Sequence, residues 1–171
     1  MGKDKLIKRL RWYYPLEKFH AFFTFPLLTI YFLMKYPFIK SIWFIYGMSV
    51  CIVVLYQGQK YWQLKLWRLE GKPFSQVKNL RFFKKAKRIN FLLIAGMPIV
   101  LAVQLLIADW AVTDFDLLLW SFAANLFAVL EYVNYYHTQL MVDNTADVAY
   151  ILRNKKFKTA SLAKDLKENS F

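Results

Sequence analysis

Four long apolar runs alternate with charged segments along this chain. They cover residues 19–34, 39–56, 89–108 and 117–136. A helix needs about 20 predominantly apolar residues to cross the hydrocarbon core of a bilayer, and each run approaches that length. The pattern predicts an all-α, polytopic membrane protein in which four transmembrane helices form two hairpins, with interfacial and cytosolic helical extensions.

The N-terminal segment, residues 1–18, has a different pattern. Leu6, Leu10 and Tyr13 recur at helical spacing between lysine and arginine residues. A basic helix with one apolar face is suited to the membrane interface. We therefore predict an amphipathic helix along the inner surface that ends near Pro15, because proline interrupts helices.

The segment 57–88, between the second and third runs, is predicted to form a cytosolic helical hairpin. Helix-forming residues continue from the second run until Leu69, and Gly71 and Pro73 then favour a turn. Ser75 follows the turn, and a serine side chain can cap the first turn of a new helix. The second and third spans should therefore extend beyond the bilayer.

Residues 137–171 are predicted to form a cytosolic C-terminal tail. The helix of the fourth run is expected to continue toward Leu152. The last dozen residues are mainly polar, so we expect them to be mobile.

Lysine and arginine residues are distributed unevenly between these segments. Residues 1–18 contain six, residues 57–88 contain ten and residues 137–171 contain six, whereas the two other connections contain only Lys35 and Lys40. Segments rich in lysine and arginine stay on the cytoplasmic side during insertion. We therefore expect both termini and the hairpin on the cytoplasmic side, or its stromal or matrix equivalent, of a bacterial inner membrane or an equivalent membrane.

Composition and charge agree with this interpretation. The chain is 58% hydrophobic, which exceeds the proportion typical of soluble domains. Its net charge of +13 would also suit nucleic acid, but the charges lie at the predicted membrane boundary among aromatic residues. We expect membrane lipids, including anionic headgroups, as partners and no nucleic acid. The candidate headgroup-binding residues are Arg9, Arg11, Lys84, Lys85, Lys87 and Arg88.

One stretch near the end of the fourth span concentrates hydrogen-bonding side chains. Glu131 is the only carboxylate well inside a predicted span, Asn134 lies one turn later on the same face, and His137 lies at its edge. A charged side chain in hydrocarbon costs about 3 kcal/mol, so such a residue is a functional candidate. In an enzyme acting on a lipid or isoprenoid-type substrate at the inner leaflet, Glu131 or His137 would be the general base and Asn134 would orient it.

Two other interpretations of Glu131 remain open. It can lock the helix bundle by pairing with one of three basic residues at the inner boundary: Lys18, Lys60 or Arg88. It can also line a polar path for ions or protons together with Asn125 and Gln104. Four spans make a thin wall around such a path, so this last interpretation requires several copies of the chain.

His20 and His137 flank the first and fourth spans at the same predicted depth. Two imidazoles at one depth can ligate a haem or a pigment metal, which makes both residues cofactor-binding candidates. Neither has a ligand-type residue three or four positions later in the sequence. We therefore predict no metal site and no cofactor, and keep a haem or pigment as the alternative.

The sequence contains no complete catalytic or nucleotide-binding signature. It has no glycine-rich phosphate loop and no nucleophile turn, and its single cysteine, Cys51, excludes an internal disulfide. We therefore expect a protein that acts mainly by binding, as an accessory or assembly subunit of a larger membrane complex, with a protein partner or as a homo-oligomer. A membrane enzyme using Glu131, Asn134 and His137 is the alternative.

Overall fold

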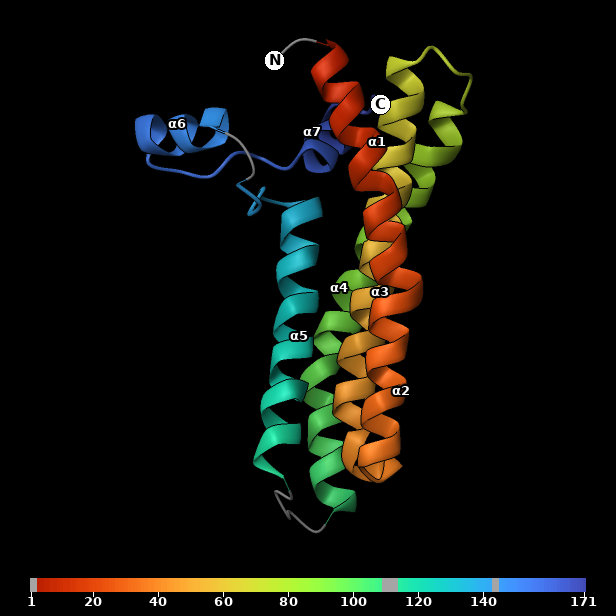
Figure 1. Ribbon diagram of the computed structural model, residues 1–171, viewed down its shortest axis with the longest axis vertical. Helices are drawn as coiled ribbons and strands as arrows, with labels where there is room; N and C mark the ends of the chain where they lie inside the picture. Colours follow the sequence, from red (N-terminus) through yellow and green to blue (C-terminus); the bar gives the residue numbers. More distant parts are fainter. Residues whose placement is uncertain (1–2, 109–113, 143–144) are drawn as a thin grey trace.

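The computed structural model describes residues 3–108, 114–142 and 145–171, so positions 1, 2, 143 and 144 of the predicted terminal segments lie outside it. The described residues form helices and no β-strand, apart from an isolated bridge between Thr138 and Thr159. Figure 1 shows the long helices side by side along one axis, with α6 lying to one side. In chain order the helices are α1 (Lys3–Phe19), the π-helix η1 (His20–Thr24), α2 (Phe25–Lys35), α3 (Phe38–Leu69), α4 (Gln76–Ile107), α5 (Phe115–Tyr136), α6 (Thr145–Asn154) and α7 (Ser161–Glu168). The predicted all-α fold is confirmed for this part of the chain.

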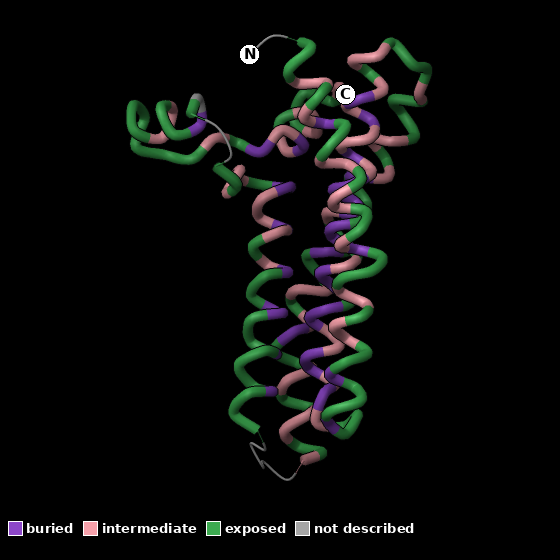
Figure 2. Tube along the Cα trace, in the orientation of Figure 1, coloured by how far each residue is buried: buried purple, intermediate pink, exposed green. Residues whose placement is uncertain are grey.

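The other long helices assemble around α3. It runs the length of the bundle, and α1, α2, α4 and α5 all contact it (Figure 1). In its most apolar stretch 50% of the residues are buried, compared with 33% in α5 and 11% in α4. Figure 2 shows that buried positions follow the inner sides of the helices, whereas their outward faces are exposed. A chain of this kind leaves much of its apolar surface to lipid or to a partner.

Within the described residues, three helices are long and apolar enough to cross a membrane: α3, α4 and α5. They contain the predicted second, third and fourth spans, which supports an integral helical membrane protein. The predicted first span, residues 19–34, is instead divided between η1 and the 11-residue α2. An 11-residue helix is only about 16 Å long, so helix length alone does not establish a fourth span.

The division of the first span has a local cause at Pro26. Proline has no N–H, and its ring clashes with the carbonyl of the preceding turn. The wider turn of η1 directly precedes this region and ends at Thr24, and a π-helical turn is a common way to accommodate such an interruption. Thr29 Oγ1 donates to the Phe25 carbonyl oxygen at 2.8 Å, which adds a side-chain bond where the backbone ladder is irregular.

The prediction that the N-terminal helix ends near Pro15 is wrong. α1 continues to Phe19 and passes through η1 into α2 as one rod beside α3 (Figure 1). Contacts hold this path, because Leu10 is 1% exposed and Gln63 Nε2 donates to Tyr14 OH at 3.4 Å. Here the contacts between α1 and α3 outweigh the tendency of proline to interrupt a helix. The interfacial position of residues 1–18 stays a prediction.

The structure has a helical hairpin within residues 57–88, and its cytosolic position stays a prediction. α3 ends at Leu69, Gly71 adopts a φ of +71°, and α4 begins directly after Ser75. Ser75 Oγ accepts a hydrogen bond from the Lys78 backbone N–H at 3.4 Å, as expected of an N-cap serine.

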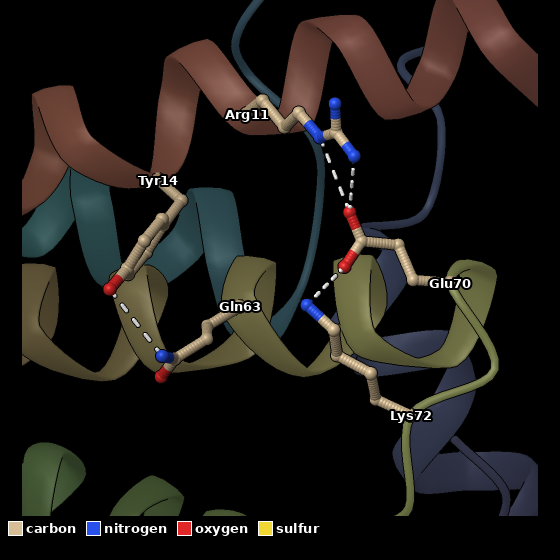
Figure 3. Close-up of polar contacts among 5 residues, drawn as sticks. All are labelled: Arg11, Tyr14, Gln63, Glu70 and Lys72. Atoms are coloured by element: carbon tan, nitrogen blue, oxygen red, sulfur yellow. Dashed lines mark hydrogen bonds and ion pairs between the residues drawn. The ribbon is translucent and has the colours of Figure 1, made fainter.

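The tip of this hairpin is tied to α1. Arg11 Nη2 lies 2.9 Å from Glu70 Oε1, and Lys72 Nζ lies 2.7 Å from Glu70 Oε2 (Figure 3). The hydrogen bond from Lys72, and then that from Arg11, lower the pKa of Glu70 below its usual value. Glu70 therefore stays charged near neutral pH, and its ion pair with Arg11 fixes the end of α3 against α1.

The helix of the predicted fourth span, residues 117–136, ends where that span ends, and the extension predicted beyond it is wrong. α5 stops at Tyr136 instead of continuing toward Leu152, and residues 137–142 are not helical. Asn134 Oδ1 accepts a hydrogen bond from the Leu140 backbone N–H at 2.8 Å. A side chain that binds the backbone just beyond it competes with the helical ladder, which gives a physical reason for the stop.

The C-terminal residues form a packed helix, contrary to the predicted mobile tail. Leu162 of α7 is 1% exposed, and Tyr61 OH donates to Asp165 Oδ2 at 2.7 Å. The ring of Phe171 lies 5.5 Å from that of Phe83 in α4. α7 therefore closes the hairpin end of the bundle.

Candidate functional site

Three helices converge on the carboxylate of Glu17 at the hairpin end of the molecule. Glu17 lies near the end of α1, Trp62 in the extended part of α3, and Tyr135 in the last turn of α5. Glu17 Oε1 accepts a hydrogen bond from Trp62 Nε1 at 3.1 Å and another from Tyr135 OH. Its other oxygen, Oε2, is buried and has no hydrogen-bond partner among the described residues. Such an acceptor calls for a water molecule or a ligand group.

The local sequence explains why Glu17 points inward. Leu10 and Tyr13 precede it by seven and four residues, so all three side chains share the face of α1 that meets α3. Gly58 of α3 leaves space for Tyr135, because a Cβ atom at this glycine would overlap the tyrosine ring. The carboxylate is therefore held between a close helix contact and an apolar helix face.

The surroundings of Glu17 favour its protonated form. Burial raises the pKa of Glu17 from the usual 4.5 to about 7, because a charged carboxylate loses hydration there. In decreasing order of size, the hydrogen bond from Tyr135 lowers this pKa, the charge of Glu131 raises it, and the bond from Trp62 lowers it. Near neutral pH the carboxyl group can therefore act as a donor or as an acceptor.

A cavity of about 80 Å³ adjoins Glu17 between α1, α3, the end of α5 and the start of α7. This volume has room for on the order of five water molecules. Both signs of charge line it, since Arg9 and Lys65 contribute to the wall together with Glu17, and the rings of Tyr13 and Trp62 lie between them. The cavity is therefore suited to a small charged or polar group.

Glu131 does not form the ion pair that one interpretation predicted. In the described part of the chain no ion pair joins it to any of the three proposed partners, Lys18, Lys60 and Arg88. Lys60 Nζ instead lies 3.7 Å from the centroid of the Phe82 ring. Glu131 is half-buried, and its charge reaches Glu17. The structure thus brings together two carboxylates that the sequence separates by more than a hundred residues.

Asn134 and His137, the other predicted catalytic residues, have local partners. Asn134 Oδ1 accepts from the backbone N–H groups of Leu140 at 2.8 Å and Met141 at 3.2 Å. His137 is exposed, with its Nε2 3.3 Å from Tyr132 OH. Partial loss of hydration, and then the charge of Lys87, lower the pKa of His137 below the usual value. Both residues organise the end of α5, and their catalytic role stays a prediction.

The two histidines each bond to a nearby hydroxyl group. His20 Nδ1 lies 3.1 Å from Thr24 Oγ1, one turn further along the same rod. Groups of three or more His, Cys, Asp or Glu side chains that could hold a metal ion do not occur among the described residues. The absence of a cofactor stays a prediction, and haem or pigment ligation by His20 and His137 stays its alternative.

At least three of the six headgroup candidates have protein partners, including Arg9, whose guanidinium carbon lies 5.9 Å from the centroid of the Tyr13 ring. Arg11 bonds to Glu70 at the hairpin tip, and Lys84 Nζ donates to Asn169 Oδ1 at 2.6 Å. Arg9 lines the cavity beside Glu17. The other candidates are exposed or half-buried along α4: Lys85, Lys87 and Arg88.

The residues proposed for a polar path lie in helix contacts instead. Gln104 Oε1 accepts from the Trp43 backbone N–H at 2.6 Å, and Asn125 Nδ2 donates to the Trp43 carbonyl oxygen at 3.0 Å. Both therefore serve to join α4 and α5 to α3, and neither is hydrogen-bonded to Glu131.

A second buried network, missed in the sequence, joins α3, α4 and α5. Gln57 and Asn90 exchange two amide hydrogen bonds of 3.1 and 2.7 Å, and Tyr136 OH donates to Gln57 Oε1 at 2.6 Å. All three side chains are buried. Because the pairing is complete on both amides, this network is structural and leaves no group directed at a ligand.

Glu17 was also missed, although the sequence carries a signal for it. It is an acidic residue on the apolar face of a basic helix, four residues after Tyr13. That face is predicted to lie on the membrane surface, where a carboxylate has no evident role. A helix face that packs against other helices has the same spacing of apolar residues, so the spacing alone does not distinguish the two cases.

Comparison of the chain with protein-family models, curated proteins and solved structures finds no match. Its function must therefore be inferred from its own geometry.

Proposed function

We propose that this chain is a multi-pass membrane protein with four spans that acts mainly by binding, as an accessory or assembly subunit of a larger membrane complex. The observation that carries the proposal is the poor coverage of α4, of whose most apolar stretch only 11% is buried by the rest of the chain. In α3 and α5 the rest of the chain buries a larger share of the most apolar stretch. Either lipid or a second protein covers the exposed part of α4, and the subunit proposal requires a second protein.

The continuity of α1, η1 and α2 supports a fourth span. From Phe19 to Lys35 the rod measures about 25 Å at 1.5 Å per residue, close to the thickness of a hydrocarbon core. Phe32 in α2 contacts Phe44 in α3 with ring centroids 4.4 Å apart, so this rod lies within the bundle. Phe25 and Leu28 are partly buried, and many of the other large side chains are apolar and exposed, as lipid contact requires: Phe22, Phe23, Leu27, Ile30, Tyr31 and Met34.

Charge distribution supports the orientation. With four spans, both termini and the hairpin lie on one side, where they carry all lysine and arginine residues except Lys35 and Lys40. We propose that this side is the cytoplasm, or its stromal or matrix equivalent. A +13 chain at that surface is attracted to anionic headgroups.

The alternative, an enzyme acting on a lipid or isoprenoid-type substrate, draws support from the closeness of Glu17 and Glu131 beside a cavity. Two neighbouring carboxyl groups are suited to proton transfer. Replacement of Glu131 by Gln and of His137 by Ala should then abolish turnover in a folded protein. Unchanged turnover in both variants would remove the predicted catalytic set.

Two matched tryptophan substitutions test the subunit proposal. Ala102 on α4 and Ala123 on α5 are both exposed in this chain. If α4 carries the partner interface, Ala102→Trp should release the partner, whereas Ala123→Trp should retain it. The measurement is native mass spectrometry of complexes extracted from the membrane with their lipid. A wild-type chain that runs alone with lipid, or equal loss in both variants, contradicts the proposal.

A further inference from the structure

The cavity beside Glu17 has its two cations at one end. Arg9 precedes Glu17 by two helical turns along α1, which places it about 12 Å further from the start of the first span. Lys65 follows Trp62 by one turn along α3, in the direction of the hairpin tip. Both cations therefore lie on the side of Glu17 that faces away from the proposed bilayer, and both line the same cavity.

The start of α7 also contributes to the wall of the cavity. Ala160, Ser161 and Leu162 line it, and Ser161 is the first residue of α7. Figure 1 places α7 at the hairpin end of the bundle, and residues of both α1 and α7 line the cavity. Backbone N–H groups at a helix start favour anions. Two cations, a hydroxyl group and a helix start thus converge on one region, which is a typical environment for phosphate.

The opposite end of the cavity is uncharged at low pH and lies at the membrane boundary. Its wall there consists of Glu17, Trp62 and the last turn of α5, at Asn134 and Tyr135. Glu17 Oε2 supplies a buried oxygen without a partner in the described residues. A protonated carboxyl group at this position can donate a hydrogen bond to an ester carbonyl or a hydroxyl group.

We propose that this cavity binds a glycerol phosphomonoester, the headgroup of phosphatidic acid, with the phosphate at Arg9 and Lys65 and the glycerol ester oxygens at Glu17. The order of groups fits a lipid, because the phosphate lies outside the glycerol and the acyl chains continue toward the bilayer. Two cations match a phosphomonoester, which carries up to two negative charges.

This inference rests on the membrane placement proposed above. Glycerol 3-phosphate has the same phosphomonoester chemistry without acyl chains, so it distinguishes a soluble source from a lipid source. Phosphatidylglycerol has the acyl chains but a phosphodiester. Comparing these two probes with phosphatidic acid separates the roles of phosphate and chains.

The test is native mass spectrometry of the purified full chain, titrated with dioleoyl phosphatidic acid, dioleoyl phosphatidylglycerol and glycerol 3-phosphate. Wild-type protein should retain phosphatidic acid roughly tenfold better than either other probe, as expected when charge-assisted hydrogen bonds are lost. Lys65→Met should reduce retention of phosphatidic acid by a similar factor. Lys60→Met, which removes a lysine from the same helix outside the cavity, should leave retention unchanged.

A second measurement tests Glu17 by pH. Ionisation of this residue as the pH rises through about 7 places a negative charge beside the ligand, so wild-type retention should fall relative to Glu17→Gln. Glu17→Gln is the reference because the phosphate of the ligand still titrates in this variant, whereas residue 17 does not. The charged or titratable groups that line the cavity or act on Glu17 are Arg9, Tyr13, Tyr61, Lys65, Glu131 and Tyr135.

Equal retention of all three probes, or equal losses in Lys65→Met and Lys60→Met, would overturn the proposal. Stronger retention of glycerol 3-phosphate than of phosphatidic acid would overturn its lipid part. Identical pH profiles of wild type and Glu17→Gln would overturn the role of Glu17. None of these results alters the partner release expected of Ala102→Trp, so the two proposals fail independently.

Discussion

α3 and α4 are nearly equal in length and hydropathy but differ in their use of apolar surface. Each has 32 residues, and their most apolar stretches have similar mean hydropathy, yet 50% of that stretch is buried in α3 and only 11% in α4. The hydropathy of a helix therefore does not determine how closely that helix packs against its neighbours. In a bilayer, lipid tails are as apolar as leucine, so close packing depends on small residues and paired polar groups.

Small residues distinguish the two helices at their contacts. α3 meets α5 through Gly47 and Gly58, where an added Cβ would overlap Asn125 and Tyr135. On α4, a Cβ at Gly96 would meet chiefly the hydroxyl oxygen of a tyrosine side chain, at 2.6 Å. The backbone of α3 thus lies close to side chains of α5, whereas α4 makes a looser contact with α3.

The largest difference between the two helices is expected from Gly58→Ala compared with Gly96→Ala. The first forces a packed tyrosine ring away and should cost about 3 kcal/mol, the upper range for overpacking of a core. The second meets only the end of Tyr46, which can move, and should cost less than about 1 kcal/mol. Unfolding in mixed detergent micelles measures both. Equal costs would show that α3 and α4 do not differ in packing.

A smaller difference is expected from leucine truncation. Leu55 of α3 is 6% exposed, whereas Leu92 of α4 is 68% exposed. Leu55→Ala leaves a cavity between helices and should cost about 2 kcal/mol. Leu92→Ala should change stability by less than about 0.5 kcal/mol, because lipid fills the space. The same unfolding assay applies, and a cost at Leu92 that matched Leu55 would indicate a buried α4 face within the isolated chain.

The smallest effect concerns the amide pair that joins the two helices. Gln57→Leu leaves Asn90 and the Tyr136 hydroxyl group unpaired and should cost about 1 kcal/mol. The double variant Gln57→Leu with Asn90→Leu removes both amides and should recover part of that loss. A double variant whose cost equals the sum of the two single costs would contradict coupling through this pair.

Local patterns predicted the parts of the fold that local physics determines. Gly71 and Ser75 carry the turn and cap that define the hairpin, and the structure confirms them. The prediction from Pro15 is wrong because this proline lies inside a helix that is held by packing against α3. Such long-range contacts are not visible in the local sequence pattern.

The candidate site was predicted only in part for the same reason. Glu131 was recognised because a carboxylate inside an apolar run is conspicuous. Glu17 acquires its role through Trp62 and Tyr135, which lie 45 and 118 residues away. The α7 contact at Leu162 was also missed, since a short polar segment shows its apolar anchors only when another helix is present to receive them.

Topology is tested most directly by cysteine labelling. In a Cys51→Ala background, single cysteines replace Lys5, Pro37 and Pro73, all exposed, and intact cells are treated with a membrane-impermeant maleimide. Four spans with the hairpin inside predict that only Pro37→Cys reacts before the membrane is opened. Reaction of Pro73→Cys from outside, or reaction of Lys5→Cys and Pro73→Cys from opposite sides, would contradict it.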